Sequence, residues 1–150
     1  MPRLSQILAH EHGYCDNLFA QAENAVADKQ WPTAQTYFDT FHQATQTHFR
    51  NEEDILFPAF EGQTGMGGGP TYVMRMEHAQ MRDLFTAMQQ ALDKRDAQTY
   101  LGLSESLLML MQQHNIKEER ILYPMLDQAL AHETEALLSQ LHPAEALMAE

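Results

Sequence analysis

Two stretches of the chain share an unusual combination of residues. HFRNEEDILFPAF (residues 48–60) and HNIKEERILYPML (residues 114–126) each begin with a histidine, carry a glutamate four residues later, and continue through an aliphatic pair and an aromatic residue to a proline. A histidine and a glutamate at this spacing lie on the same face of an α-helix. Imidazole nitrogens and carboxylate oxygens together are typical ligands of iron, manganese and zinc. Each stretch therefore predicts one half of a metal site.

The two stretches belong to a repeat that covers most of the chain. A shift of 66 residues, without a gap, places His48 on His114 and Glu52 on Glu118. The same shift places Glu11-His12 on Glu77-His78. The repeat thus supplies a matched set of candidate metal ligands: His12, His48, Glu52, His78, His114 and Glu118.

These six residues interrupt stripes that are otherwise apolar, so a helical fold would bury them. A buried carboxylate without a partner is costly unless a cation compensates its charge. Six bulky ligands suit two ions better than one: each ion takes two histidines, both glutamates bridge the pair, and positions stay open for water, hydroxide, oxide or a small external ligand. We expect two iron ions in a di-iron centre, with zinc or manganese as substitutes. A metal-free bundle whose polar core groups satisfy one another is the alternative.

Four helices are needed to bring these residues together. Apolar residues recur at steps of three and four, and no convincing strand pattern occurs. Pro32 suits a first helical turn, whereas the Gly-rich segment GQTGMGGGP cannot hold a helix. We expect helices near residues 4–28, 32–60, 71–92 and 97–129, and a helical tail at 133–148 interrupted by His142-Pro143. The predicted fold is an all-α, up-down-up-down four-helix bundle of two pseudo-repeated hairpins, in a single domain over residues 1–150.

Other ionisable residues lie near the predicted ligands in the sequence. Neighbours of a ligand on a helix point about 100° away from the ligand face. We therefore expect the glutamates beside the ligands to be solvated acids, with partners for the ligand imidazoles as the alternative; these are Glu11, Glu53, Glu77 and Glu119. Cys15 is predicted to be a core thiol. The remaining histidines are expected on the surface or in packing contacts, with His10 as the candidate exception that supports a ligand; they are His10, His42, His132 and His142.

Composition excludes several classes of function. The chain has 9 basic and 21 acidic residues and a formal net charge of −12, which argues against binding to nucleic acid or to an anionic membrane. A single cysteine permits neither an internal disulfide nor a Cys-based zinc site. No apolar run reaches the length of a membrane span or of a signal-peptide core. A cytoplasmic protein is the expectation, and its oligomeric state does not follow from the sequence.

Four motifs resemble the hemerythrin-like (HHE cation-binding) family over about residues 4–128: AHEHGYCDNLF, HFRNEEDILFP, MRMEHAQMRDLF and HNIKEERILYP. The resemblance implies a four-helix bundle with a non-haem di-iron centre, in which the four histidines are terminal ligands and Glu52 and Glu118 are bridges. Oxygen-carrying members have a second histidine where this chain has Arg82, and an aspartate five residues after the last histidine, whereas Glu118 comes at four. The set of four histidines and two glutamates is more similar to the iron-centre repair and iron-sensing members.

The resemblance implies a protein that binds or senses O2 or NO, or that holds iron. The alternative is an enzyme-like role in stress: reduction of NO or peroxide, or iron donation during repair of iron–sulfur clusters. The expected partners are therefore small ligands such as O2, NO and peroxide. A binding protein is favoured over a dedicated enzyme.

Overall fold

The computed structural model describes residues 2–144, and within that range every regular element is helical. The first half runs through α1 (Leu4–Ala27), α2 (Trp31–Arg50), the π-helix η1 (Asn51–Leu56) and α3 (Phe57–Thr64). The second half runs through α4 (Pro70–Asp93), α5 (Ala97–Lys117), the π-helix η2 (Glu118–Leu122), α6 (Tyr123–Ala129) and α7 (Thr134–Gln140). The predicted all-α fold is confirmed.

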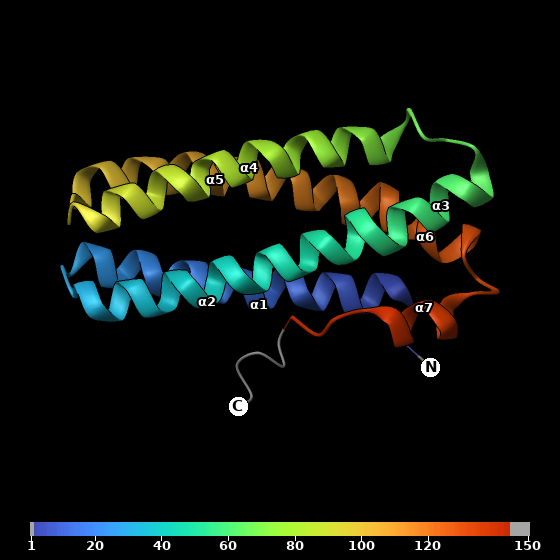
Figure 1. The fold of residues 1–150 in the computed structure, drawn as a ribbon, viewed down its shortest axis with the longest axis horizontal. Coiled ribbons are helices and arrows are strands. Elements are labelled where there is room, and N and C mark those ends of the chain that lie inside the picture. The colour runs from blue at the N-terminus through green and yellow to red at the C-terminus, as the bar shows by residue number, and fades with distance from the viewer. Residues whose placement is uncertain (1, 145–150) are drawn as a thin grey trace.

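The four long helices form a closed ring of neighbours. α1 packs against α2, and α4 packs against α5, so each half of the chain is one hairpin. Contacts of α1 with α5 and of α2 with α4 join the hairpins, which lie as an upper and a lower pair in Figure 1. This arrangement is the predicted up-down-up-down bundle.

The described part of the tail is one short helix, α7, which ends near the predicted interruption at His142-Pro143. Its helix ends at Gln140, and Leu141 already has an extended backbone, with φ −70° and ψ 141°. Pro143 opposes a return to helix, because proline disfavours helical backbone in His142, the residue before it. The predicted positions 145–148 lie outside the described residues.

The turns inside the two hairpins are copies of each other. Lys29 and Arg95, which are 66 residues apart, both adopt a positive φ, at 55° and 52°. In both turns the residue after the left-handed one closes back on its helix: Gln30 donates its amide to Ala25, and Asp96 to Ala91, at 2.9 Å in each case. The sequence repeat therefore extends to backbone conformation.

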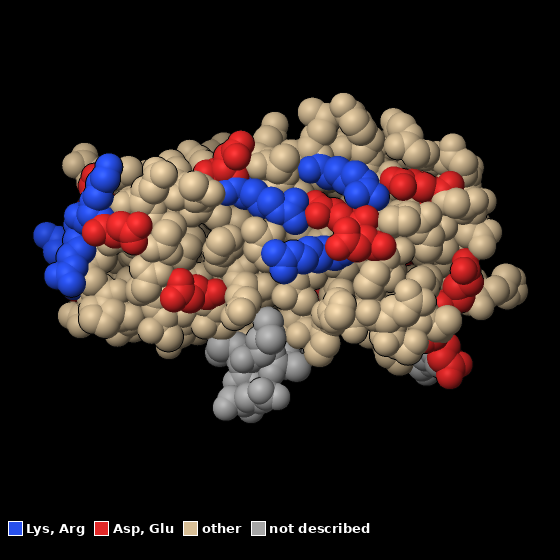
Figure 2. Space-filling model, in the orientation of Figure 1, with Lys and Arg blue, Asp and Glu red and all other residues tan. Residues whose placement is uncertain are grey.

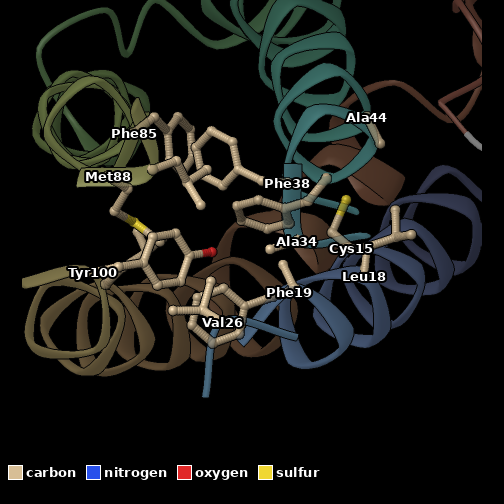
Figure 3. Close-up of a cluster of buried hydrophobic side chains, with 14 of the residues drawn as sticks. Cys15, Leu18, Phe19, Val26, Ala34, Phe38, Ala44, Phe85, Met88 and Tyr100 are labelled. Carbon is tan, nitrogen blue, oxygen red and sulfur yellow. The ribbon is translucent and has the colours of Figure 1, made fainter. Parts of the chain in front are cut away.

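The apolar core is divided in two by a polar layer. One cluster, rich in aromatic residues, lies toward the hairpin turns, and Figure 3 shows Phe38, Phe85 and Tyr100 packed together within it. The other contains Leu8, Leu56 and Leu122 and lies toward the opposite end. On each long helix the predicted ligands fall between residues of the two clusters, as His12 does between Leu8 and Cys15. The candidate ligands therefore occupy a central layer with apolar packing on both sides.

Charged side chains of both signs lie on the face of the molecule in Figure 2. Acidic side chains on the face in Figure 2 are scattered, and several lie next to basic ones across the middle of the molecule. Among residues 2–144, no helix has both the length and the apolar run needed to cross a membrane.

Candidate metal centre

All six predicted ligands meet in the central layer, where they form two groups of four. His12 and His48 make one group and His78 and His114 the other, and both groups include Glu52 and Glu118. Within each group, one ligand atom per residue lies within 4.8 Å of the others. All six side chains are buried. Two carboxylates shared by two pairs of imidazoles are the arrangement that the repeat predicts for two adjacent cations.

The Nε2 atom of every one of these histidines faces a shared carboxylate. In the first group, His12 Nε2 lies 3.1 Å from Glu118 Oε1, and His48 Nε2 lies 3.4 Å from Glu52 Oε2. In the second group, His78 Nε2 lies 3.1 Å from Glu52 Oε1, and His114 Nε2 lies 3.1 Å from Glu118 Oε1. The nitrogens and carboxylate oxygens therefore point at common centres.

The Nδ1 atom of each histidine is held by a different glutamate. Glu119 lies 2.7 Å from Nδ1 of His12, and Glu53 lies 2.7 Å from Nδ1 of His78. Glu11 and Glu77 make the equivalent contacts, at 2.7 Å to His48 and 2.8 Å to His114. A carboxylate at Nδ1 keeps a proton there, so the lone pair of a neutral imidazole is at Nε2, toward the centre.

These contacts correct one expectation from the sequence. The glutamates beside the ligands are not free solvated acids; the alternative, partners for the ligand imidazoles, is what the structure shows. Glu53 follows the ligand Glu52, so its side chain points about 100° away from the ligand face of its own helix. In that direction it meets His78 on the adjacent helix α4. The matched Glu-Glu and Glu-His pairs in both copies were the signal for this role.

The two π-helices carry the shared glutamates. The amide of Phe57 bonds the carbonyl of Glu52, and the amide of Tyr123 bonds that of Glu118, each five residues back. Pro58 and Pro124 follow immediately, and neither ring can donate to the carbonyl four residues before it. A widened turn accommodates the proline without ending the helix. Long-range helical periodicity does not reveal such a local change, so the sequence predicted continuous α-helices here.

Two cations secure the glutamates behind the second group. Arg82 makes a bidentate pair with Glu53, with both N–O distances at 2.8 Å. Lys117 pairs with Glu77. Burial opposes ionisation of Glu53, but hydrogen bonds from His78 and Arg82 outweigh it and lower the pKa of Glu53 to about 2. The guanidinium of Arg82 is therefore bound to a carboxylate and does not face the centre.

Without metal, protons supply the positive charge of the centre. Burial alone would lower the pKa of His114, but Glu118 and Glu77 raise it to about 9. Glu52 and Glu11 likewise overcome burial and hold the pKa of His48 well above its usual range. The imidazoles in turn hold the pKa of Glu52 well below its ordinary value, against desolvation. The centre thus pairs carboxylates with imidazolium cations.

This proton-filled state leaves polar atoms without partners, which tests whether the donors fit a metal. His78 Nε2 and His114 Nε2 lie 3.1 Å from carboxylate oxygens, yet four buried ligand atoms make no hydrogen bond of regular geometry: Glu52 Oε1, His78 Nε2, His114 Nε2 and Glu118 Oε2. Buried polar atoms are rarely left unpaired, because each lost partner costs about 1–3 kcal/mol. All four atoms belong to residues of the second group, in which one ligand atom of each residue lies within 4.8 Å of the others, so the donors fit a cation there.

Tyr123 adds a polar group that the sequence did not single out. Its hydroxyl donates to Glu52 Oε2 at 2.5 Å and lies 2.9 Å from Glu118 Oε1. The same oxygen lies 3.1 Å from His12 Nε2 and 3.3 Å from His48 Nε2. Burial and the two carboxylates raise the pKa of this phenol well above its usual value. The sequence contained one signal for this group: the first copy of the repeat has a phenylalanine, Phe57, where the second has Tyr123.

A small cavity reaches the centre from the side of the aromatic cluster. Its volume is about 20 Å³, which is room for one water-sized molecule. The walls include His12 and His48 of the first group together with Cys15, Phe49, Met81 and Met111. Cys15 is buried in this wall as a core thiol, and burial raises its pKa. A small ligand could therefore lie beside the centre.

Comparison with known protein families agrees with this geometry. A family model described as the hemerythrin HHE cation-binding domain matches residues 3–144. Comparisons with curated proteins and with solved structures found no match. The family match spans nearly the whole chain and includes both groups of converging histidines and glutamates. The chain therefore belongs to the hemerythrin HHE cation-binding domain family.

Proposed function

We propose that the protein holds two iron ions in the central layer and binds or senses a small ligand such as O2 or NO. The observation that carries this proposal is the pair of four-residue groups that share Glu52 and Glu118, with four ligand atoms left unpaired. When bound, two ferrous ions supply open positions and electrons to a small ligand. The mixed imidazole and carboxylate donors suit iron, with manganese and zinc as competitors.

The chain's own residues have distinct roles in this proposal. His12 and His48 bind one ion, His78 and His114 bind the other, and the two shared glutamates hold the ions together. Four outer glutamates orient the imidazoles through Nδ1. His48 and His114 lose their protons as the metal enters, so loading releases protons.

Arg82 supports a place near the iron-sensing and iron-centre repair members of the family rather than the oxygen carriers. It stands where oxygen carriers have an additional histidine, and its guanidinium is bound to Glu53. The second group therefore has two imidazoles and no third. The cavity of about 20 Å³ beside His12 and His48 supports a diatomic ligand rather than a larger substrate.

Metal analysis after purification without oxygen tests the ligand set. We expect about two iron ions per chain, and loss of most of the iron in Glu52→Ala, because both groups lose a shared carboxylate. Glu105→Ala removes an exposed acid on α5 and is the matched control, which should keep its iron. Iron near zero in the unaltered protein, with undiminished thermal stability, would refute the metal centre. Unchanged iron in Glu52→Ala would refute the bridging role.

Addition of O2 to the di-ferrous protein separates ligand binding from the enzyme-like alternative. A change in visible absorption that reverses under vacuum is expected if the protein carries or senses the ligand. Fast, irreversible oxidation would instead support redox chemistry or iron donation. The same experiment with NO tests the second ligand.

A further inference from the structure

The hydroxyl of Tyr123 occupies a position that a hydrogen bond to Glu52 alone does not require. It lies within 3.3 Å of one atom from each of the four residues of the first group. Two donors at right angles on an ion with bonds of about 2.1 Å lie about 3 Å apart. The separations of 2.5–3.3 Å are therefore those of a fifth donor adjacent to the other four.

We propose that Tyr123 binds the metal ion held by His12 and His48, as a phenolate that only one of the two metal positions possesses. This inference rests on the proposed function, because it presupposes that metal binds. As the oxygen–metal bond forms, the phenol proton leaves to solvent, and no electron is transferred. The ring is fully buried in the apolar cluster of Leu8, Leu56 and Leu122, which holds the oxygen toward the centre.

The repeat shows that the phenol is an addition to a centre whose six predicted ligands match in pairs. Phe57 corresponds to Tyr123, and it packs on His78 as Tyr123 packs on His12. The ring centroids are 6.1 Å apart in the first pair and 5.5 Å in the second, with interplanar angles of 16° and 27°. The second group therefore has an aromatic edge without a donor at the matching place. The two metal positions differ by one oxygen.

The charged residues around the two metal positions also differ, and they too favour a more positive ion beside His12 and His48. Arg82 and Lys117 neutralise the glutamates behind His78 and His114. Within residues 2–144, neither Glu119 nor Glu11, behind His12 and His48, forms an ion pair with a lysine or arginine. The residues that match Arg82 and Lys117 in the first copy are Asp16 and Asn51. The position of His12 and His48 thus retains more negative charge, which favours an ion of higher charge, such as ferric iron.

Visible and resonance Raman spectroscopy of the ferric protein tests the proposal. The protein is loaded with ferrous iron without oxygen, then oxidised with ferricyanide. We expect a phenolate-to-iron charge-transfer band, and Raman modes excited in that band that shift when the protein contains ring-deuterated tyrosine. Tyr123→Phe should abolish the band, whereas Tyr100→Phe, which removes a buried phenol in the aromatic cluster, should retain it.

The outcomes separate this inference from the proposed function. Two ferric ions per chain without deuterium-sensitive modes would overturn the phenolate and leave the metal centre standing, as would an unchanged band in Tyr123→Phe. A protein that holds no iron would overturn both. If Tyr123→Phe fails to fold, the labelled, unaltered protein still shows whether a tyrosine binds iron, and the structure places the Tyr123 hydroxyl against the ligands.

Discussion

At the scale of single residues, the centre depends on which nitrogen of each imidazole faces inward. The four outer glutamates determine the orientation of the imidazoles. Each accepts a hydrogen bond from Nδ1 of one histidine, so that its Nε2 faces a shared carboxylate. Two of these contacts cross between the hairpins: Glu119 reaches His12, and Glu53 reaches His78. The sequence predicted all six inner residues from spacing and repeat. It named the outer four but gave their contact with the imidazoles only as the alternative, because reach between helices is a tertiary property.

Glu53→Gln tests the role of an outer glutamate. The amide keeps the shape but removes the charge that holds His78 and that pairs with Arg82. We expect the affinity for one of the two metal ions to fall by about 10–100-fold, measured by competition with a chelator of known affinity. Glu105→Gln, on an exposed part of α5, should leave the affinity unchanged. Equal affinities in the two variants would show that the outer contact does not tune the metal.

At the scale of elements, the two hairpins share the same backbone features. Each hairpin has one left-handed residue at its turn and one π-helix before a proline. The sequence predicted the long helices and their breaks from apolar periodicity, Pro32 and the Gly-rich segment, but α3 continues to Thr64 and so enters that segment. It could not show the π-helices, because they change hydrogen bonding over five or six residues without changing the apolar stripe.

The left-handed residues predict a simple gain in stability. Lys29 and Arg95 are exposed, and a non-glycine residue pays a steric cost at positive φ. Lys29→Gly and Arg95→Gly should each raise the free energy of unfolding by roughly 0.5–1 kcal/mol in urea titrations. Lys94→Gly is the matched control, because Lys94 has an ordinary φ of −91° and glycine there should destabilise. Destabilisation by all three variants would contradict the argument.

At the scale of the whole molecule, the polar layer couples protonation to folding. Glu52 and Glu118 have lowered pKa values in the folded protein, so their stabilisation is present above about pH 4.5 and is lost as the pH falls. His114, with its pKa raised from 6.5 to about 9, stabilises fully below pH 6.5, and this stabilisation is lost as the pH rises through 9. The metal-free fold is therefore most stable between about pH 4.5 and pH 6.5.

The metal-free protein should consequently lose thermal stability between pH 6.5 and 9. The shift at His114 alone corresponds to roughly 3 kcal/mol, and His48 changes in the same direction. Differential scanning calorimetry across this range, with and without bound metal, provides the measurement. The metal-loaded protein should not show the decline, because its imidazoles are already deprotonated. A constant melting temperature of the metal-free protein over this range would contradict the protonated centre.

The crossed contacts of the hairpins also have a mechanical consequence. Glu52 belongs to the first hairpin and Glu118 to the second, and each contacts histidines of both. A metal pair held by these side chains would tie together two halves of the chain that the Gly-rich segment connects. In a protein with a single cysteine, such a centre takes the place of a disulfide staple, and it can be opened by a chelator instead of a reductant.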